Sequence, residues 1–363
     1  MKRKFELYFS DDYTLSDYRL LEVPDDSFMA KLKEGEIFSV KGKELDSAVL
    51  CTNSCSFVLR KAETTNLLAF CEVQNSQVSD TDTGVGKLII RATPAFHLDL
   101  SKENTGKGAL SALLKEYCIA NREDFYEGKK FISWSQLQNE IPCSSEELES
   151  LLKMAMVMQK DGHWAALAES WIEEIVSLVL TSMLAEDMAL DKINVEKLCS
   201  VLKDEVPPPV LKHIVVSFSD NCHHPNEKTA SMSAKLICRF LAKRLLRVED
   251  RWVKREFEMT LKNALHGLAD FDPCCIEDVC IEVPGTPEPL VVKCILEELP
   301  DLPKLRFRHL FQIKRQYKHK EILPFLKHIQ SPDTADRLLL KYAKSGKVQN
   351  QDGSATRVYT ERA

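Results

Sequence analysis

The sequence predicts a multidomain α+β protein in which a strand-rich N-terminal region precedes three helical units. Short apolar runs, several of them alternating, follow one another closely up to about residue 100, which is typical of small barrels and open sheets. From about residue 105 the apolar residues recur at nearly every fourth position, which is the period of amphipathic helices. A length of 363 residues is sufficient for two or three domains, and a hydrophobic content of 44% is that of a globular chain.

Residues 1–100 are expected to form a small β-barrel domain. The strand-like runs are LLEV, EIFSVKG, SAVLCT, SFVLRKA, NLLAFCEV and GKLIIRAT. No long helix is expected to cover them, and so small a sheet has difficulty burying its apolar face alone. We therefore expect partner chains to complete the barrel. The polar segment at residues 75–86, NSQVSDTDTGVG, is expected to be a long exposed loop within this domain.

The first helical unit, residues 101–168, has the element order of a winged-helix domain, namely helix, short helix, helix and hairpin. The first helix is marked by Leu110, Leu113, Leu114 and Tyr117. The segment FISWSQLQNEI contains the second helix. Ser144 and Glu147 have the spacing of a capping box at the start of the third helix. The pair Asp161 and Gly162 is a turn signal between two short strands.

The second unit, residues 169–248, follows without a clear linker. Its first helix face is marked by Trp171, Ile172, Ile175, Val176 and Val179. Asn194 is expected to cap a second helix, and the prolines at residues 207–209 precede a third, because proline suits a first helical turn. The polar segment 219–233 is expected to replace a wing or to form an exposed loop. The next helix has its apolar residues at Leu236, Phe240 and Leu241.

The third unit, residues 249–363, begins with a helix whose apolar stripe is Phe257, Leu261, Leu265 and Leu268. A proline-rich stretch, VPGTPEPLVVKCILEELPDLP, contains a predicted strand, and RFRHLFQIKRQY leads into the terminal pattern. That pattern is helix, turn, helix and hairpin, in KEILPFLKHI, SPDT, ADRLLLKYAK and SGKVQNQDGSATRVYTER. The order is again that of a winged helix. The three units share a pattern without an exact sequence repeat.

Charge is distributed unevenly along the chain. Residues 304–363 contain 14 of the 49 Lys and Arg residues but only 5 of the 55 Asp and Glu residues, a net charge of +9, whereas the preceding residues carry −15. Arg337, Lys341 and Lys344 recur at spacings of four and three and are expected on one helix face, with Lys347 and Arg357 on the wing. Such cations can contact DNA phosphates. The alternative is a solvated helix face. Few Asn or Gln residues share this face, so any DNA binding is expected to be weakly sequence-specific.

No enzyme signature accompanies this basic segment in the sequence. The phosphate-binding patterns G-x₄-G-K-[ST] and G-x-G-x-x-G and the nucleophile pattern G-x-S-x-G are all missing, and we expect neither catalysis nor a cofactor. The cysteine-containing clusters are Cys51 with Cys55, Cys222 with His223 and His224, and Cys274, Cys275 and Cys280. We expect core thiols rather than metal ligands, because a structural zinc site requires four matched ligands. Reduced cysteines and the lack of a signal peptide or apolar span predict a cytosolic or nuclear protein.

Motifs near both ends resemble one known family. The N-terminal motifs are LLEV at 20–23, IFSVKG at 37–42, SAVLCT at 47–52 and SFVLRKAETTNLLAF at 56–70. The C-terminal motifs are RFRHLF at 306–311, ILPFL at 322–326, LLLKYA at 338–343 and the closing RVYTER. In this order they resemble the Dcc-type sister-chromatid-cohesion subunit of the alternative replication factor C clamp loader. Two departures, Tyr317 for the usual Trp and Ser56-Phe57 for Thr-Tyr, keep the apolar or aromatic character.

The resemblance implies a non-catalytic adaptor in the nucleus. It implies that the N-terminal strands join a small subunit and the tail of the large clamp-loader subunit in one composite barrel. It further implies three winged helices, docking on the catalytic subunit of DNA polymerase epsilon through the barrel and the first winged helix, and DNA contact by the later ones. The clamp-loading ATPase is implied to lie on other subunits.

Two rival hypotheses come from other classes of protein. The main alternative is a winged-helix transcriptional regulator that binds a specific DNA sequence as a self-sufficient dimer. A weaker one is an enzyme with a cysteine-rich metal site. The sequence does not determine whether the DNA is single- or double-stranded.

Overall fold

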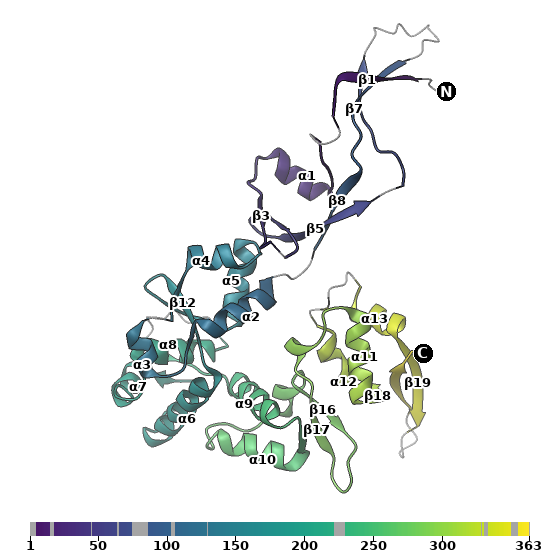
Figure 1. The fold of residues 1–363 in the computed structure, drawn as a ribbon. Coiled ribbons are helices and arrows are strands. Elements are labelled where there is room, and N and C mark those ends of the chain that lie inside the picture. Colours follow the sequence, from purple (N-terminus) through teal and green to yellow (C-terminus); the bar gives the residue numbers. More distant parts are fainter. Residues whose placement is uncertain are drawn as a thin grey trace. The chain divides into compact units, whose positions relative to one another are not determined.

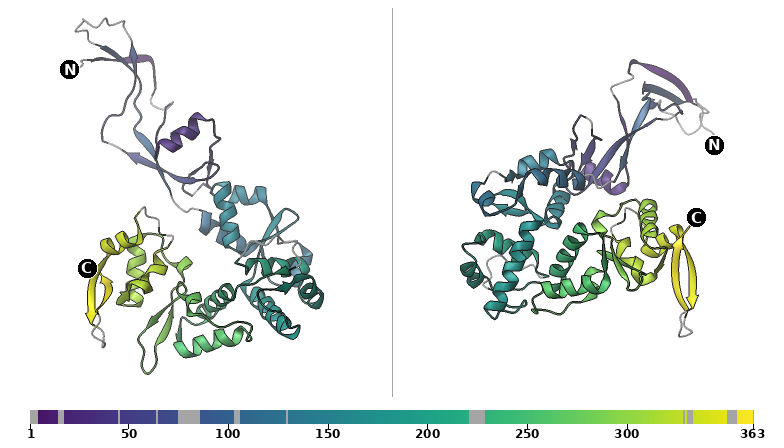
Figure 2. Two further views of the ribbon diagram at one scale, coloured as in Figure 1. Left: turned by 180° about the vertical axis from the view of Figure 1, so that it is seen from behind. Right: turned by 60° about the horizontal axis from the view of Figure 1, so that its bottom comes forward.

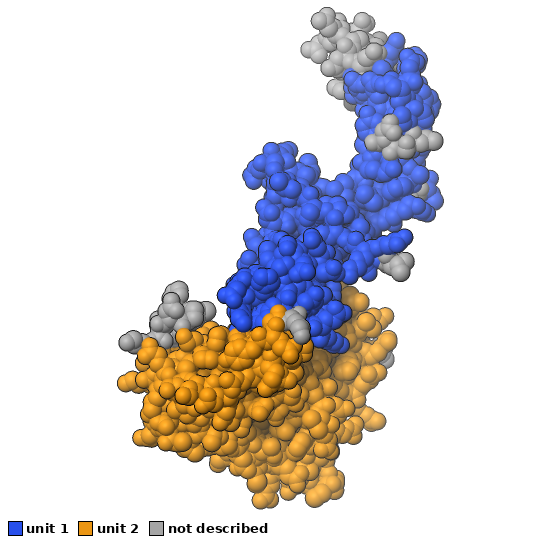
Figure 3. Space-filling model, turned by 60° about the vertical axis from the view of Figure 1, so that its left-hand side comes forward, with its two compact units in different colours: residues 1–117, 131–164 blue, residues 118–130, 165–363 orange. Residues whose placement is uncertain are grey.

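The computed structural model shows an α+β protein with many helices and several sheets, which confirms the predicted class (Figure 1). It describes residues 5–14, 18–44, 46–63, 65–74, 86–102, 106–128, 130–220, 229–327, 329, 333–349 and 355–362. The chain divides into two compact units (Figure 3). Unit 1 comprises residues 1–117 and 131–164, and unit 2 comprises residues 118–130 and 165–363. Among the described residues, no helix is both long enough and apolar enough to cross a membrane.

The N-terminal strands form two open sheets. The three-stranded sheet has the order β1 (Phe5–Thr14), β7 (Gly86–Ala92) and β6 (Phe70–Gln74). The five-stranded sheet has the order β2 (Leu20–Glu22), β8 (Phe96–Ser101), β5 (Ser56–Glu63), β4 (Val49–Cys51) and β3 (Ser39–Lys41). The predicted barrel is therefore not closed by this chain: within the described residues, β1 and β6 remain edges of one sheet, and β2 and β3 remain edges of the other.

Three N-terminal elements were not predicted from the sequence. Strands β1 and β8 lack a clean alternation of buried and exposed residues, and β1 pairs in parallel with β7, some 80 residues away. Helix α1 (Asp26–Lys33) is capped by Asp25, whose carboxylate accepts a hydrogen bond from the Phe28 N–H at 2.9 Å. The buried Phe28 packs against Phe57, so this short helix covers part of the five-stranded sheet. Residues 75–85 of the loop predicted at residues 75–86 lie outside the described residues, and Gly86 is the first residue of β7.

Within unit 1 the capping box predicted at Ser144 and Glu147 is confirmed, and it also joins the sheet to the helices. The Glu147 carboxylate accepts hydrogen bonds from the Ser144 hydroxyl at 3.0 Å and from the backbone N–H of Ser56 at 3.3 Å. The Ser56 hydroxyl also donates to Glu147 and accepts from the Ser144 N–H at 2.7 Å. Ser56 is the first residue of β5, so one carboxylate connects a strand of the sheet to the start of a helix.

The first helical unit contains the predicted helices and hairpin. These elements are α2 (Gly106–Glu116), β10 (Ile132–Ser133), α4 (Trp134–Glu140), α5 (Ser145–Met154), β11 (Met158–Lys160) and β12 (His163–Leu167). Asp161 and Gly162 both have positive φ, 50° and 74°, as a two-residue hairpin turn requires. The short strand β9 (Cys118–Ile119) and helix α3 (Arg122–Glu127) were not predicted, because neither is long enough to show a period.

Unit 2 begins with helices that the sequence predicted well. They are α6 (Glu169–Ala185), α7 (Val195–Val201) and α8 (Pro208–Ser217), with the short strands β13 (Ile193–Asn194) and β14 (Thr229–Ala230). The stripe from Trp171 to Val179 is buried as expected. Asn194 caps α7, accepting from the Lys197 N–H at 3.0 Å.

The segment 219–233 was predicted to replace a wing or to form an exposed loop, and its last described residues are not an exposed loop. Ala230, Met232 and Ser233 are buried, because β14 pairs with β13. Residues 221–228, with the cluster Cys222, His223 and His224, lie outside the described residues. Helix α9 (Ala234–Val248) buries Ile237, Cys238, Ala242 and Leu246, whereas the predicted Leu236, Phe240 and Leu241 are only half-buried.

The next elements form a second three-stranded sheet with its helices. They are β15 (Arg251–Val253), α10 (Lys254–Ala264), the 3-10 helix η1 (Pro273–Ile276), β16 (Cys280–Val283), β17 (Leu290–Lys293) and the 3-10 helix η2 (Leu296–Glu298). Strand β17 confirms the strand predicted in the proline-rich stretch. Phe257, Leu261 and Leu265 are buried, and Leu268 is half-buried beyond the end of α10.

Four cations of α9 connect it to neighbouring elements of unit 2. Arg239 forms two hydrogen bonds to Asp278, at 3.0 and 2.7 Å, and one to Glu297 at 2.7 Å. Lys243 also donates to Glu297, at 3.0 Å. On the other side, Arg244 pairs with Glu173 at 3.0 Å, and Arg247 pairs with Glu169. The half-exposed network fixes α9 against α6 and η2.

Neutralising Glu297 is expected to lower the free energy of unfolding of unit 2 near neutral pH but not below pH 2. Burial would raise the pKa of Glu297, but Lys243 and Arg239 outweigh it and lower that pKa to about 2. Because the folded pKa lies below the unfolded value of about 4.3, the stabilisation is present above that value and is lost as pH falls toward 2. Glu297→Gln should therefore cost roughly 1–2 kcal/mol at pH 7, allowing for solvent screening.

The measurement is thermal unfolding of the full chain between neutral and acidic pH. The acid dependence should be flatter in Glu297→Gln than in the wild type. Glu174→Gln, which removes an exposed carboxylate from the middle of the neighbouring α6, should change neither stability nor slope. Equal pH profiles for wild type and Glu297→Gln would contradict the assigned role.

The C-terminal elements end in a third sheet (yellow in Figures 1 and 2). They are α11 (Pro303–Ile313), β18 (Gln316–Lys318), α12 (His319–Ile322), the 3-10 helix η3 (Leu323–Leu326), α13 (Ala335–Tyr342), β19 (Ala343–Gln349) and β20 (Ala355–Glu361). The helix predicted over residues 320–329 is thus a single α turn followed by a 3-10 turn, because Pro324 has no N–H for an α-helical bond. The last helix ends at Tyr342, two residues earlier than predicted.

Three sheets of the helical part share one strand order, in which the last strand along the chain lies in the middle and pairs antiparallel with the first. The orders are β10-β12-β11, β15-β17-β16 and β18-β20-β19. Two of these sheets fall within residues 249–363, a stretch that sequence analysis assigned to one unit. In each of the three sheets, a short strand that lies between two helices in the sequence pairs with the second strand of the hairpin that follows. The N-terminal sheet β1-β7-β6 also has its last strand in the middle, but β7 pairs there in parallel with β1.

Candidate nucleic-acid interface

The core of the C-terminal region determines which face of α13 is exposed. Leu338 and Leu339 are buried in one cluster with Phe307, Phe311 and Tyr359, which belong to α11 and β20. Buried residues on one side of a helix place the remaining positions in solvent. Arg337 and Lys341, four residues apart, therefore lie exposed on the outer side of α13.

Two arginines of this segment stabilise the fold by donating hydrogen bonds to backbone carbonyls. Arg306 is only 1% exposed and donates to the carbonyls of Pro300 at 2.7 Å, Phe325 at 3.1 Å and Lys327 at 2.7 Å. Arg362 donates to the carbonyls of Leu340 and Lys341, at 2.8 and 3.1 Å. These are among the last carbonyls of α13, which have no partner inside the helix, so Arg362 stabilises its end.

Tyr317, at the position where sequence comparison expected Trp, is fully buried. Its hydroxyl donates to the Leu310 carbonyl at 2.5 Å, and burial raises its pKa. The substitution therefore keeps an aromatic core position and satisfies a backbone acceptor of α11.

All five predicted DNA-contacting cations lie on two adjoining elements, α13 and the hairpin of β19 and β20. Lys347 and Arg357 are directly opposite each other in the hairpin, so their side chains share one face. Lys344 does not lie on the helix face predicted for it. It is the second residue of β19, three positions before Lys347. Because side chains alternate along a strand, Lys344 and Lys347 point to opposite faces of the hairpin.

These cations are available to other molecules. Arg337, Lys341, Lys344, Lys347 and Arg357 are all exposed. Lys341 has a carboxylate, that of Asp333, at 3.9 Å. For the other four, no carboxylate of the described residues lies within ion-pairing distance. Exposed cations of this kind can bind phosphates and release counterions from DNA.

A hollow of about 440 Å³ lies next to the cations, between α12, α13 and β20. It is lined by His319, Asp336, Leu340, Arg357 and Tyr359. The imidazole Nε2 of His319 lies 3.1 Å from a carboxylate oxygen of Asp336. The Arg357 guanidinium lies 5.3 Å from the centre of the Tyr359 ring. Sequence analysis missed this hollow, because its residues come from three elements. The one indication in the sequence was Asp336, an acidic residue next to the cations of a basic segment.

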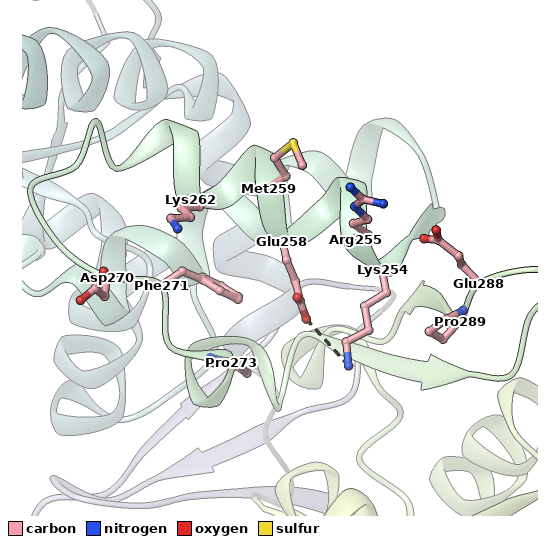
Figure 4. A pocket seen from close by; sticks show the side chains of 10 residues that line it. All are labelled: Lys254, Arg255, Glu258, Met259, Lys262, Asp270, Phe271, Pro273, Glu288 and Pro289. Atoms are coloured by element: carbon pink, nitrogen blue, oxygen red, sulfur yellow. Dashed lines mark ion pairs between the residues drawn. The ribbon is translucent and has the colours of Figure 1, made fainter.

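A second hollow, of about 730 Å³, lies beside α10 (Figure 4). Its charged lining residues are mixed in sign: Lys254, Arg255 and Lys262 against Glu258, Asp270 and Glu288. Lys254 is already engaged by Glu282 at 2.7 Å and by Glu258 at 3.9 Å. A phosphate would meet three carboxylates here, so this hollow is less suited to DNA than the C-terminal face.

Of the five described cysteines of the clusters, two are buried, two are half-buried and one is exposed. Cys51 lies buried in β4 and Cys275 in η1, while Cys55 and Cys280 are half-buried and Cys274 is exposed. Burial raises the pKa of Cys51, and it raises that of Cys280 to about 12. Such thiols stay protonated at neutral pH. Within the described part of the chain, no three His, Cys, Asp or Glu side chains are grouped to hold a metal ion.

The chain matches a known protein family over most of its length. Residues 18–326 match the model of the family described as sister chromatid cohesion protein Dcc1. The chain belongs to the Dcc1 family. The resemblance inferred from the end motifs is therefore confirmed, and this Dcc1-family chain is a sister chromatid cohesion protein. The matched region ends before α13 and the last hairpin.

Individual relatives extend the similarity beyond that region. The probable sister chromatid cohesion protein DCC1 of Dictyostelium discoideum is 26% identical over 365 residues, covering 93% of each chain. The DCC1 proteins of Xenopus laevis and Homo sapiens are 23% and 21% identical, covering 93% and 95% of this Dcc1-family chain and 89% and 88% of their own.

Proposed function

We propose that this Dcc1-family protein is a non-catalytic adaptor of an alternative replication factor C clamp loader in the nucleus. One end assembles with other subunits, and the other end contacts DNA. Through this arrangement it connects the loader to DNA polymerase epsilon and to the replication fork, where sliding clamps are loaded or unloaded and cohesion is established. The observation that carries the proposal is an apolar N-terminal sheet that the described residues of the chain leave uncovered.

The uncovered sheet is that of β1, β7 and β6. Leu7 and Phe9 of β1 are 63% and 66% exposed, and Val73 of β6 is also exposed. Exposed apolar residues on a sheet with unpaired edges are typical of strands that pair with another chain. This supports a composite barrel completed by a small subunit and by the tail of the large clamp-loader subunit.

The shared strand order of three sheets supports tandem winged-helix domains in the helical part. Docking on the catalytic subunit of polymerase epsilon is proposed for the barrel and the first of these domains, following the family resemblance. The DNA contact is proposed for the C-terminal face, on the positions of Arg337, Lys341, Lys347 and Arg357. It is expected to be weakly sequence-specific, because cations that contact phosphates do not read bases.

Replacing Leu7 and Phe9 by Asp is expected to separate the protein from its clamp-loader partners. Two charges on β1 would oppose burial of the sheet in an interface, and removal of central apolar contacts typically costs an interface about tenfold or more in affinity. The measurement is co-purification of the small and large subunits with the full chain. Leu184→Asp changes an equally exposed leucine on α6 and should retain both subunits. Full recovery of both subunits with the β1 variant would contradict the proposed assembly.

A further inference from the structure

The position of Asp336 is unusual for a surface that contacts only phosphates. Its side chain is 77% exposed, and it lies in the first turn of α13 between the cations of that helix and Arg357. A carboxylate near the N-terminus of a helix stabilises the helix dipole. The same carboxylate repels every phosphate that approaches. A group that can donate hydrogen bonds, and not a phosphate, is therefore the suitable occupant of the space beside Asp336.

We propose that the hollow between α12, α13 and β20 holds one unpaired nucleotide of DNA, an inference that rests on the proposed DNA contact of this face. Its volume, about 440 Å³, lies within the range of sites that enclose a small molecule, about 300–1,000 Å³. The walls offer the apolar side chain of Leu340, which is 61% exposed, and the planar groups of His319 and Arg357. Guanidinium and imidazole planes are surfaces on which unstacked bases pack.

The polar groups are arranged for the two ends of a nucleotide. One oxygen of the Asp336 carboxylate lies 3.1 Å from His319 Nε2, and the other can accept a hydrogen bond from an amino group on a base edge. Arg337 and Lys341 adjoin Asp336 and Leu340 along α13, and Lys347 lies opposite Arg357 in the hairpin, so the surrounding cations can bind the flanking phosphates. A base within a duplex has its faces stacked and its edge paired, and only an extruded or single-stranded base can enter such a hollow.

The inference predicts a preference among DNA forms. The full chain should bind single-stranded DNA, and a duplex with a single-nucleotide gap, more tightly than the same duplex without a gap. Loss of one base-stacking contact typically weakens binding by about five- to a hundredfold, and a partly open hollow should lie at the lower end. Fluorescence anisotropy with the three labelled DNAs, over a series of salt concentrations, measures the preference.

Two variants test the hollow without removing a cation. Leu340→Ala removes its apolar wall and should weaken binding of the gapped and single-stranded DNAs by about fivefold, while binding of the intact duplex stays unchanged. Asp336→Asn keeps the size of the side chain, and should strengthen binding of the intact duplex by removing a repulsive charge while reducing the preference for the gap. Leu305→Ala, at an exposed leucine of α11, is the matched control and should leave all three affinities unchanged.

The outcomes separate this inference from the proposed DNA contact. If the wild-type chain binds all three DNAs with strong salt dependence but without preference, the nucleotide site is wrong and the DNA contact stands. If Leu340→Ala weakens all three equally, the hollow does not distinguish an unpaired base and the inference is again overturned. If the wild-type chain shows no salt-dependent binding to any of them, both are overturned.

Discussion

Replacing Arg306 by Met should lower the free energy of unfolding of the C-terminal helices by about 3 kcal/mol, because buried backbone groups lose charged hydrogen-bond donors. The carbonyls of Pro300, Phe325 and Lys327 would each lose a partner that Met cannot replace, because its apolar side chain ends where the guanidinium group begins. Burial lowers the pKa of Arg306, opposed by the Asp301 carboxylate at 3.5 Å, yet an arginine remains protonated at neutral pH.

Native-state hydrogen exchange of the α11 amides measures this loss directly, since it reports local opening within a larger chain. Arg308→Met changes an exposed arginine of the same helix and serves as the control. We expect α11 to exchange much faster in Arg306→Met and at the wild-type rate in Arg308→Met. Equal exchange in the two variants would show that the buried guanidinium does not hold the η3 turn against α11.

Charge reversal at Arg337, Lys341 and Lys347 should produce the largest change in DNA affinity. Each phosphate contact contributes about 0.9 to the slope of log affinity against log salt, so losing three contacts should reduce the slope by almost 3. At low salt the affinity should fall by about a hundredfold or more, because three attractive charges become repulsive. Salt titrations of the wild type and of the triple variant Arg337→Glu, Lys341→Glu, Lys347→Glu give both quantities.

Lys344→Glu is the informative control for this variant. Lys344 is equally exposed, but its side chain lies on the opposite face of β19 from that of Lys347. It should therefore change affinity little. If Lys344→Glu were as damaging as Lys347→Glu, the DNA contact would not be limited to the face shared with α13, and an unchanged slope in the triple variant would mean that this face is merely solvated.

Features determined by neighbouring residues were predicted well from the sequence. The buried stripe of α6, the Asn194 cap and the Ser144 and Glu147 box all depend on side chains within a few positions of one another. The turn at Asp161 and Gly162 is similarly local, because it depends on two residues that tolerate positive φ.

Features determined by distant residues could not be predicted. Strand β1 exists because it pairs with β7, and neither its composition nor its period indicates that partner. The end of α13 is a further example: none of the three residues after Tyr342 is glycine or proline, and the chain leaves the helix because Ala343 pairs with Glu361 in β20. That pairing moves Lys344 from the predicted helix face to a strand. The hollow at Asp336 requires three elements to fold together, so a linear pattern cannot reveal it.

Hydrogen exchange of the full chain, first with the clamp-loader subunits and then with added DNA, tests most directly whether the two ends have separate roles. The adaptor proposal predicts that the subunits protect amides of β1, β6 and β7, and that DNA then protects α13 and the β19–β20 hairpin. The opposite pattern, in which the subunits protect α13 and the hairpin and DNA protects only the N-terminal sheet, would contradict it.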